Sequence, residues 1–412
     1  MFLFSFFCML SRMPAGDLLV LRGQAVFPIG SYEMPRSDAD LKAMAEAGIN
    51  LVHCRNSADL DRAAAAGMLG WVPVPMQLGD DPQGTLRKAV EAVKDHPALA
   101  VWEGPDEVVW GFTALSNLFR EGIHKVKGEW WLQTPNALSH AEKQAAQIMP
   151  KLRAGAQLIR TLDGGRHPLW INEAARSDLA YIRQYVDSID ITGCDSYPIH
   201  EKEKTPEVIA DYTDRYRAAG RDRPVWMVLQ AFAWGNLQGF TPEVPTYPTF
   251  QETRLMAYLS LTHGAGAILY WGSAYLPPQE TRFRESILAM ARELSALQPF
   301  LVAVGRPAVQ VRLIESEGRG QAGDRGVSFL ARRAGADWLI VLANEDDRDH
   351  MGVEVGGLSS LDGKVLYELY SPHEERVEHG ELVARLAAHQ VRVYSTSRRY
   401  ETGRLTGRDY AR

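Results

Sequence analysis

The chain has 412 residues, too many for one ordinary hydrophobic core, which suits a large domain followed by a smaller one. Apolar residues make up 46% and charged residues 23%, a globular composition that excludes a disordered chain or a bundle of membrane helices. The net charge is −6 with both signs interspersed, so no nucleic-acid partner is expected. Three widely spaced cysteines predict neither a disulfide framework nor a zinc site.

The N-terminus begins with an apolar run over residues 1–10, which is too short to span a bilayer. Such a run is typical of a signal-peptide core, although the basic residue Arg12 follows it instead of preceding it. We therefore expect residues 1–16 to be a tail or a signal remnant. This favours a secreted or periplasmic location over a cytoplasmic one, with no membrane span.

From residue 17 the chain alternates between short apolar runs and helical segments. An extended segment at 18–22 is expected to form a lid strand under the domain, and 111–163 an enlarged loop and long helix. The expected strands are 25–31, 49–54, 69–74, 98–102, 167–172, 189–194, 224–229 and 266–269. Each strand is followed by a helix after a short connection, which predicts right-handed crossovers and a parallel sheet. The prediction is an α/β fold, a (β/α)8 TIM barrel over residues 17–300.

An open doubly wound sheet is the competing architecture. It would need a glycine-rich phosphate turn after the first strand, and Gly30-Ser-Tyr-Glu-Met is not such a turn. The sequence therefore favours the closed barrel.

The pattern changes after residue 300. Short apolar segments such as 338–344 and 390–394 alternate with Gly, Asp and Asn turns at the spacing of an antiparallel sandwich. We expect a small antiparallel β-sandwich over residues 305–396. Residues 397–412 are expected to form a solvated or loosely docked tail.

Catalytic residues of such barrels follow the strands, so the strand ends are the places to search. They carry carboxylates, amides and aromatic rings: Tyr32; Arg55; Glu103, Asp106 and Glu107; Asn172; Asp195 and Tyr197; Gln230 and Trp234; Tyr270 and Trp271. This set holds no lysine for a Schiff base, no histidine cluster for a metal and no phosphate-binding glycines, so no cofactor or metal is expected. Rings that stack and carboxylates that cleave are suited to a hydroxylated substrate. The predicted partner is a carbohydrate.

Several motifs occur in an order that resembles a known superfamily: Phe27-Pro-Ile-Gly30, Asp40-Leu with Ala47-Gly-Ile-Asn50, Trp102-Glu-Gly-Pro-Asp-Glu107, Asp195-Ser-Tyr-Pro198 and Gly266-Ala-Ile-Leu-Tyr-Trp271. The whole chain resembles glycoside hydrolases that have a TIM barrel followed by a β-sandwich. The resemblance implies cleavage of an oligo- or polysaccharide, with the acid/base carboxylate after strand four at Glu107. It also implies a nucleophilic Glu at the end of strand seven, where this chain has Gln230.

An amide cannot replace that nucleophile, so three alternatives stay open. In the first, Asp195 is the nucleophile, with Glu173 or Glu33 behind it, and lies several ångströms from Glu107. In the second, Asp106 and Glu107 act as the Asp-Glu pair of the barrel β-hexosaminidases, whose substrate supplies its own acetamido group. In the third, the barrel binds sugar without cleaving it.

The candidate catalytic residues are therefore Glu107, Asp195 and Asp106, and the other strand-end residues are expected to bind substrate. Two of these have specific expectations. Arg55 could pair with Asp106 or Glu107 across the barrel mouth, which would hold a carboxylate ionised. Gln230 is expected to be a buried amide that needs partners, and a sugar hydroxyl is a natural one.

Overall fold

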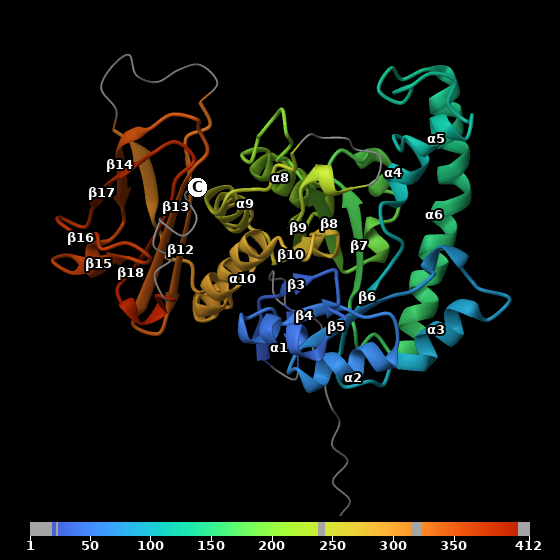
Figure 1. The fold of residues 1–412 in the computed structure, drawn as a ribbon, viewed down its shortest axis with the longest axis horizontal. Helices are drawn as coiled ribbons and strands as arrows, with labels where there is room; N and C mark the ends of the chain where they lie inside the picture. The colour runs from blue at the N-terminus through green and yellow to red at the C-terminus, as the bar shows by residue number, and fades with distance from the viewer. Residues whose placement is uncertain (1–18, 22–23, 238–243, 315–323, 403–412) are drawn as a thin grey trace, which may run out of the picture.

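The computed structural model describes residues 19–21, 24–237, 244–314 and 324–402; the tail expected at 1–16 and the last ten residues lie outside these ranges. At its centre is a closed barrel of eight parallel strands in the spatial order β10-β3-β4-β5-β6-β7-β8-β9 (Figure 1). The strands are β3 (Ile29–Ser31), β4 (Leu51–His53), β5 (Leu69–Pro73), β6 (Leu99–Glu103), β7 (Leu169–Ala174), β8 (Ile191–Ser196), β9 (Val225–Gln230) and β10 (Ala267–Trp271). The predicted (β/α)8 barrel is confirmed.

Helices surround the barrel and close each crossover. They are α1 (Asp38–Glu46), α2 (Ser57–Ala65), α3 (Thr85–Val93), α4 (Val108–Phe112), α5 (Asn117–Arg120), α6 (Pro135–Asp163), α7 (Leu179–Ile182), α8 (Val208–Gly220), α9 (Phe250–Thr262), α10 (Thr281–Ala296) and α11 (Gln298–Leu301). The predicted enlargement after the fourth barrel strand, β6, is present as α4, α5 and the 29-residue α6. Within the described ranges, none of the helices is both long and apolar enough to cross a bilayer.

The segment before the barrel differs from its prediction. The run expected as one strand at 25–31 is divided into β2 (Gln24–Val26) and β3, because Phe27 and Pro28 interrupt the extended pairing. β2 pairs antiparallel with β1 (Leu19–Leu21), so these residues form a two-stranded hairpin outside the barrel.

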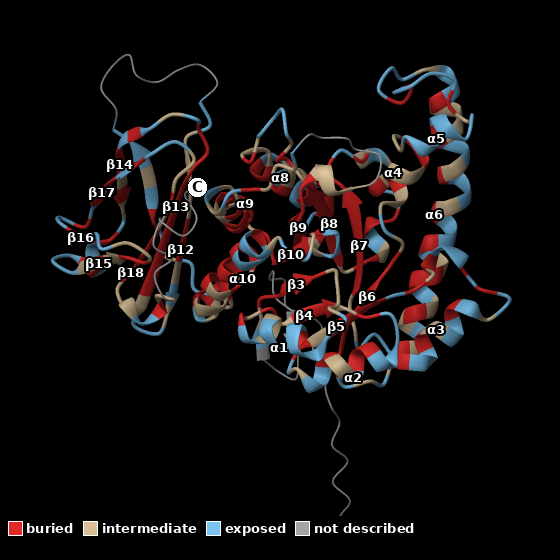
Figure 2. Cartoon of the chain, in the orientation of Figure 1, coloured by how far each residue is buried: buried red, intermediate tan, exposed pale blue. Residues whose placement is uncertain are grey.

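Two apolar layers hold the barrel together. Inside, large indole rings fill the lumen: Trp170 lies 5.6 Å from Trp71 and 5.2 Å from Trp226 between ring centroids. Outside, aliphatic strand residues pack against the helices, and Figure 2 shows the barrel strands buried while the outer helix faces are exposed. Successive side chains of a strand face opposite sides of the sheet, so alternate residues of each strand join the inner and the outer layer.

The second domain is a β-sandwich, as predicted. Its sheets are β11-β14-β17 and β12-β13-β18-β15-β16. The strands are β11 (Gln310–Leu313), β12 (Val327–Ala334), β13 (Asp337–Asn344), β14 (His350–Gly356), β15 (Val365–Glu368), β16 (Glu374–Arg376), β17 (Leu382–Leu386) and β18 (Val391–Ser395). Sequence reading missed β16, because a charged Glu-Glu-Arg edge strand has no apolar alternation. Beyond β18, Tyr400 is buried with its ring 4.6 Å from that of Phe300, so residues 398–400 dock on the barrel.

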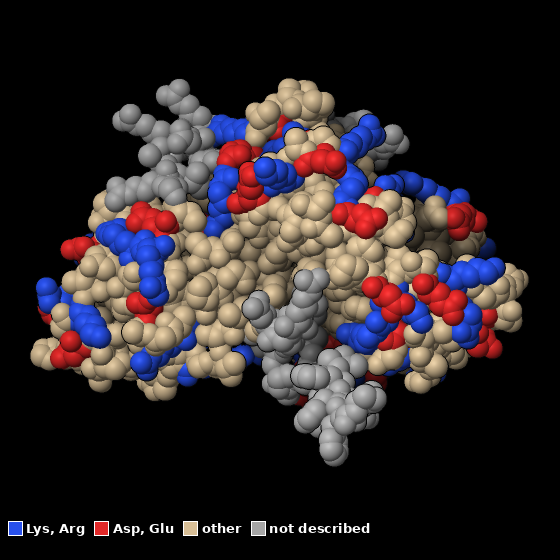
Figure 3. All heavy atoms as spheres, turned by 90° about the horizontal axis from the view of Figure 1, so that it is seen from below, with Lys and Arg blue, Asp and Glu red and all other residues tan. Residues whose placement is uncertain are grey.

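The sandwich packs on α9, which lies between the two domains in Figure 1 and is buried along most of its length. Arg254 on α9 joins three elements: its guanidinium pairs with Glu293 of α10 at 2.8 Å and donates to the Val391 carbonyl of β18 at 2.8 Å. The surface view from below shows basic and acidic side chains interspersed over the face it displays (Figure 3).

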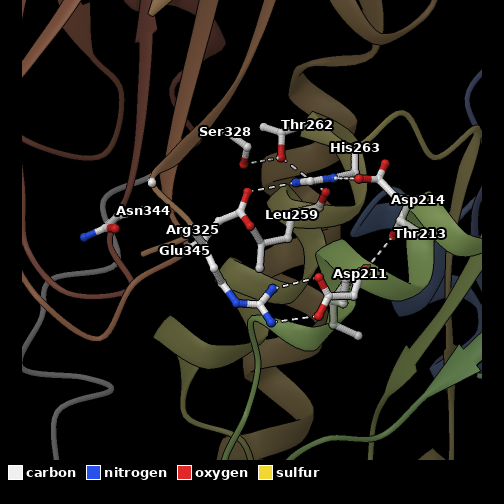
Figure 4. Close-up of polar contacts among 12 residues, drawn as sticks. Asp211, Thr213, Asp214, Leu259, Thr262, His263, Arg325, Ser328, Asn344 and Glu345 are labelled. Carbon is white, nitrogen blue, oxygen red and sulfur yellow. Dashed lines mark hydrogen bonds and ion pairs between the residues drawn. The ribbon is translucent and has the colours of Figure 1, made fainter. Parts of the chain in front are cut away.

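A polar cluster at the domain junction is drawn in Figure 4. Arg325 donates to both carboxylate oxygens of Asp211, at 2.8 and 2.7 Å. The His263 ring lies between Asp214 at 2.9 Å and Glu345 of the sandwich at 2.8 Å, so it bridges the domains. Burial lowers the pKa of His263, but the hydrogen bonds to Glu345 and Asp214 outweigh burial and the net shift is upward.

This raised pKa predicts a pH-dependent junction. A histidine whose pKa is higher folded than unfolded stabilises the fold fully below its unfolded pKa, and the effect is lost as pH rises through the folded value. We expect His263→Gln to lower the unfolding free energy by about 1 kcal/mol at pH 6 and by less at pH 9. Urea unfolding at both pH values measures this, with exposed His373→Gln as control. An equal loss at both values would contradict it.

Candidate active site

The stretch after β6 places three carboxyl groups at the barrel mouth. β6 ends at the buried Glu103, and Gly104-Pro105 turn the chain toward α4. Glu107 precedes α4 with φ +48°, a left-handed conformation that costs a non-glycine residue about 1–2 kcal/mol. Its backbone N–H donates to the Asn172 carbonyl at 3.0 Å, which fixes the strained turn to β7. Such strain persists where the surrounding structure holds a side chain in one position.

Glu107 and Asp195 form a pair in direct contact. Their carboxyl groups hydrogen-bond to each other, although they come from β8 and from the turn after β6. Burial raises the pKa of Asp195 well above its ordinary value, and the Glu107 and Asp106 charges raise it further. Burial and then Asp106 raise the pKa of Glu107, against the hydrogen bond from Asp195. Two carboxyls in such close contact cannot both ionise readily, so the pair holds a proton to higher pH than a lone carboxyl would.

This contact differs from the separation of several ångströms expected from the sequence. The strand order is as reasoned, and Asp195 does point to the mouth, where the Tyr197 hydroxyl lies 3.4 Å from its Oδ2. Glu107 has a left-handed backbone at this turn, φ +48°, which an expectation from strand order alone does not include.

Asn172 on β7 connects the pair to Asp106. Its Nδ2 donates to Asp106 Oδ1 at 3.0 Å and to Asp195 Oδ2 at 3.1 Å. Burial raises the pKa of Asp106, and the hydrogen bond from Asn172 partly offsets this. The Oδ1 atom of Asn172 is buried without a hydrogen-bond partner in the described chain. Asn172 therefore holds two carboxylates in place and keeps an acceptor free.

Glu103 lies deeper, at one side of a cleft of about 420 Å³. Trp71 Nε1 and the Tyr32 hydroxyl donate to its two oxygens at 3.1 and 3.2 Å. Burial first, and then the Asp106 charge, raise the pKa of Glu103 to about 8. His53 Nε2 lies 3.7 Å from Glu103 Oε2, and burial and the Arg55 charge lower the pKa of this histidine to about 4. At pH 7 this corner of the cleft is therefore mostly uncharged.

Aromatic side chains surround the carboxyls. Tyr197 and Trp271 stack with centroids 5.2 Å apart and planes at 24°, and both are half-buried. Trp234 donates from Nε1 to the Tyr197 carbonyl at 3.1 Å and stacks on His200 at 4.6 Å. These three rings and that of Tyr32 are half-buried, and their binding of substrate stays a prediction.

Three predicted substrate-binding residues are placed elsewhere. Arg55 pairs with Asp59 at 3.0 Å and not with Asp106 or Glu107, because the N-terminal turn of α2 presents a nearer carboxylate. Gln230 is fully buried, and its amide is occupied by the backbone of residues 199 and 232. The side chain of Tyr270 faces the helices and packs in the outer core, whereas those of its neighbours Leu269 and Trp271 face the lumen of the barrel.

Glu173 and Glu33, the reserve candidates, have structural partners. Glu173 accepts from the Val109 N–H at 2.9 Å, the Tyr185 hydroxyl at 3.0 Å and the Ser177 hydroxyl at 2.8 Å, so it anchors the start of α4. Glu33 accepts from the Gly272 N–H at 2.7 Å and from the Ser273 hydroxyl at 2.8 Å. Both acids hold loops of the mouth in place.

Sequence reasoning overlooked Trp71 as a site residue. It lies inside a barrel strand, where an indole is ordinarily a core residue. The available signal was that Trp71 is two residues after Leu69 on β5, so both side chains face the lumen. As for metals, the described residues contain no group of three or more His, Cys, Asp or Glu side chains arranged to hold one.

This fold and site can now be compared with known proteins. A (β/α)8 barrel with carboxyls at its mouth and a following β-sandwich is an architecture of glycoside hydrolases, and solved structures of that class match this chain. At the low identities found, the comparisons show the shared fold. No protein-family model and no curated protein sequence matches the chain.

Two solved structures are particularly similar in fold. The β-galactosidase from Rahnella sp. R3 has a TM-score of 0.53 and 11% sequence identity, over 92% of this chain and 99% of that one. A GH42 β-galactosidase from G. stearothermophilus has a TM-score of 0.53 and 10% identity, over 90% and 98%. The chain spans only 60% of the length of the β-galactosidases from Marinomonas ef1 and Halorubrum lacusprofundi, with TM-scores of 0.44 and 0.46.

Proposed function

We propose that this protein is a glycoside hydrolase whose barrel mouth cleaves an oligo- or polysaccharide, with the Glu107–Asp195 pair as its proton source. The observation that carries the proposal is the direct hydrogen bond between these two carboxyls, both with a raised pKa. A general acid works near neutral pH only if its pKa is raised toward that range. Glu107 is the more exposed member, so it faces the substrate, while the buried Asp195 keeps the proton available.

The contact between Glu107 and Asp195 also helps to decide which group stabilises the positive charge at the anomeric carbon. Carboxyls that flank a glycosidic bond lie about 5–5.5 Å apart in retaining enzymes and about 6.5–9.5 Å apart in inverting ones. Two hydrogen-bonded carboxyls are closer than either and leave no room for the anomeric centre between them. This geometry favours the substrate-assisted route on 2-acetamido sugars over Asp195 as a nucleophile.

In the substrate-assisted route the carboxyls have separate tasks. Glu107 gives its proton to the glycosidic oxygen as the bond from that oxygen to the anomeric carbon breaks. The acetamido oxygen of the substrate bonds to the anomeric carbon, and the Asp106 carboxylate, oriented by Asn172, accepts the acetamido N–H. A water then attacks the anomeric carbon, the bond from that carbon to the acetamido oxygen breaks, and the water returns a proton to Glu107. The Tyr197–Trp271 stack offers a ring face to the sugar.

A barrel that binds sugar without cleaving it is the rival function. The observation that favours it is Gln230 at the end of β9, the seventh barrel strand, where the resemblance implies a nucleophilic Glu. Substrate assistance removes the need for that Glu, so turnover on 2-acetamido sugars separates the two functions.

We expect Asp195→Asn to keep hydrolysis of 2-acetamido substrates within about tenfold of wild type, because an asparagine can still hydrogen-bond to Glu107. Release of nitrophenol from 4-nitrophenyl glycosides, in pairs with and without the 2-acetamido group, measures this. The exposed Asp222→Asn is the matched control. Loss of hydrolysis on every substrate would instead make Asp195 the nucleophile. Thermal stabilisation of wild type by glycans without any release would support the binding-only barrel.

A further inference from the structure

A second hollow, of about 520 Å³, lies outside the carboxyl site. Its walls come from the enlarged segment after β6, from the loop and helix after β7, and from α8. Two tryptophans and three arginines line it: Trp130, Trp131, Arg176, Arg183 and Arg215. Neither the fold nor the proposed chemistry requires this combination at a barrel rim.

The arginines of this hollow are available to an anion. Arg176 is exposed, with its guanidinium 4.2 Å from the centroid of the Trp131 ring. Arg215 donates to the Ser177 carbonyl at 2.7 Å, and its Nε is buried without a hydrogen-bond partner. In the described part of the chain, neither these two nor Arg183 forms an ion pair with a carboxylate. The one acid in the lining, Asp178, accepts from the Ala180 N–H at 2.7 Å and caps α7.

This hollow is connected to the carboxyl site through neighbouring residues. The rings of Trp110 and Trp131 lie 5.9 Å apart, and Trp110 stands one helical turn after Glu107 on α4. Arg176 lies three residues after Glu173 in the chain, and the Glu173 carboxylate accepts a hydrogen bond from the first turn of α4. The two sites therefore lie on neighbouring elements at the same end of the barrel.

The two sites present different chemical groups. The mouth gathers Glu103, Asp106, Glu107 and Asp195, whereas the second hollow gathers three arginines. A guanidinium fork binds carboxylate or sulfate through paired hydrogen bonds, and the face of an indole stacks on a sugar ring.

We propose that the hollow around Trp131 and Arg176 is a binding subsite for an anionic sugar unit, one that carries a carboxylate or a sulfate ester. This subsite rests on the proposed function for the glycan nature of its ligand. It selects glycans with a charged unit beside the bond to be cleaved.

Calorimetric titration of the full chain tests this subsite. The probes are tetrasaccharides that contain glucuronate, galacturonate or a sulfate ester, each compared with its carboxyl-reduced or desulfated form. We expect at least one charged member to bind about tenfold more tightly than its neutral partner. The carboxylate and sulfate pairs show which group the subsite takes. The preference should weaken as salt increases, since the binding is electrostatic.

Three variants make the test specific. Arg176→Gln and Arg183→Gln should abolish the preference for the charged member, while Trp131→Ala should weaken both members of a pair. Arg385→Gln, an exposed arginine on the sandwich with the same loss of charge, should change neither. Equal affinity within every pair, or an unchanged preference in Arg176→Gln, would overturn the proposal. Tighter binding of charged glycans without any turnover would support the subsite and contradict the proposed hydrolase activity. Turnover of neutral glycans without a binding preference would support the hydrolase activity and contradict the subsite.

Discussion

Glu107→Gln is expected to lower the rate of glycoside hydrolysis by about 10²- to 10⁴-fold, the usual worth of a general acid. The amide keeps the shape of the side chain and can still accept a hydrogen bond from Asp195, but its N–H protons are not acidic enough to be transferred to the leaving oxygen. Because the backbone of Glu107 is anchored to Asn172 through its N–H, the fold should be retained. Initial rates of nitrophenol release from the most reactive aryl glycoside measure the effect.

The control separates catalysis from damage. Glu142→Gln changes an exposed glutamate on α6 and should leave the rate unchanged. Substrates with better leaving groups, which need less proton donation, should lose less activity in Glu107→Gln. A variant that retains wild-type rates on every substrate would remove Glu107 from the general-acid role.

Glu103→Gln should have the largest effect on stability. With its pKa raised to about 8, folded Glu103 holds a proton that the unfolded chain releases near its ordinary value of 4.5. A carboxyl with a raised folded pKa destabilises the fold as pH rises from the unfolded value to the folded one. From pH 4.5 to pH 8 this amounts to about 4 kcal/mol, at about 1.4 kcal/mol per unit. A glutamine stays neutral throughout this range.

We therefore expect Glu103→Gln to be close to wild type at pH 4.5 and more stable at pH 8, with a melting temperature higher by about 10 °C. Differential scanning calorimetry at both pH values measures this, with Glu142→Gln as the control. Destabilisation at pH 8 would mean that the ionised carboxylate is needed by Trp71 and Tyr32, and the assigned direction of the pKa would be wrong.

The fold could be predicted from the sequence because its signals are local. Each barrel strand is a short apolar run, and most sandwich strands alternate or end in a Gly or Asp turn. The element that escaped, β16, consists of charged residues at a sheet edge and has no apolar signal. The interruption at Phe27 and Pro28 was also missed, because it depends on pairing with residues far along the chain.

The sequence predicted which acidic residues gather at the barrel mouth, but not the contacts between them. Strand ends brought Glu107, Asp106 and Asp195 to one place, since parallel strands of a barrel all end at its mouth. The contact between Glu107 and Asp195 involves a residue with a left-handed backbone, which composition and spacing do not reveal. Gln230 was misjudged for a related reason: its partners are backbone groups of residues 199 and 232, which only the folded loops bring near.

In the proposed mechanism, cleavage of the glycosidic bond depends on the proton that Glu107 holds beside Asp195. The most direct test is the pH dependence of kcat/KM for wild type on its best 2-acetamido aryl glycoside. We expect a bell-shaped profile, because Glu107 must hold its proton while Asp106 is ionised, with both apparent pKa values above those of ordinary carboxyls. A rate that stays on its plateau at high pH, where Glu107 has lost its proton, would contradict this mechanism.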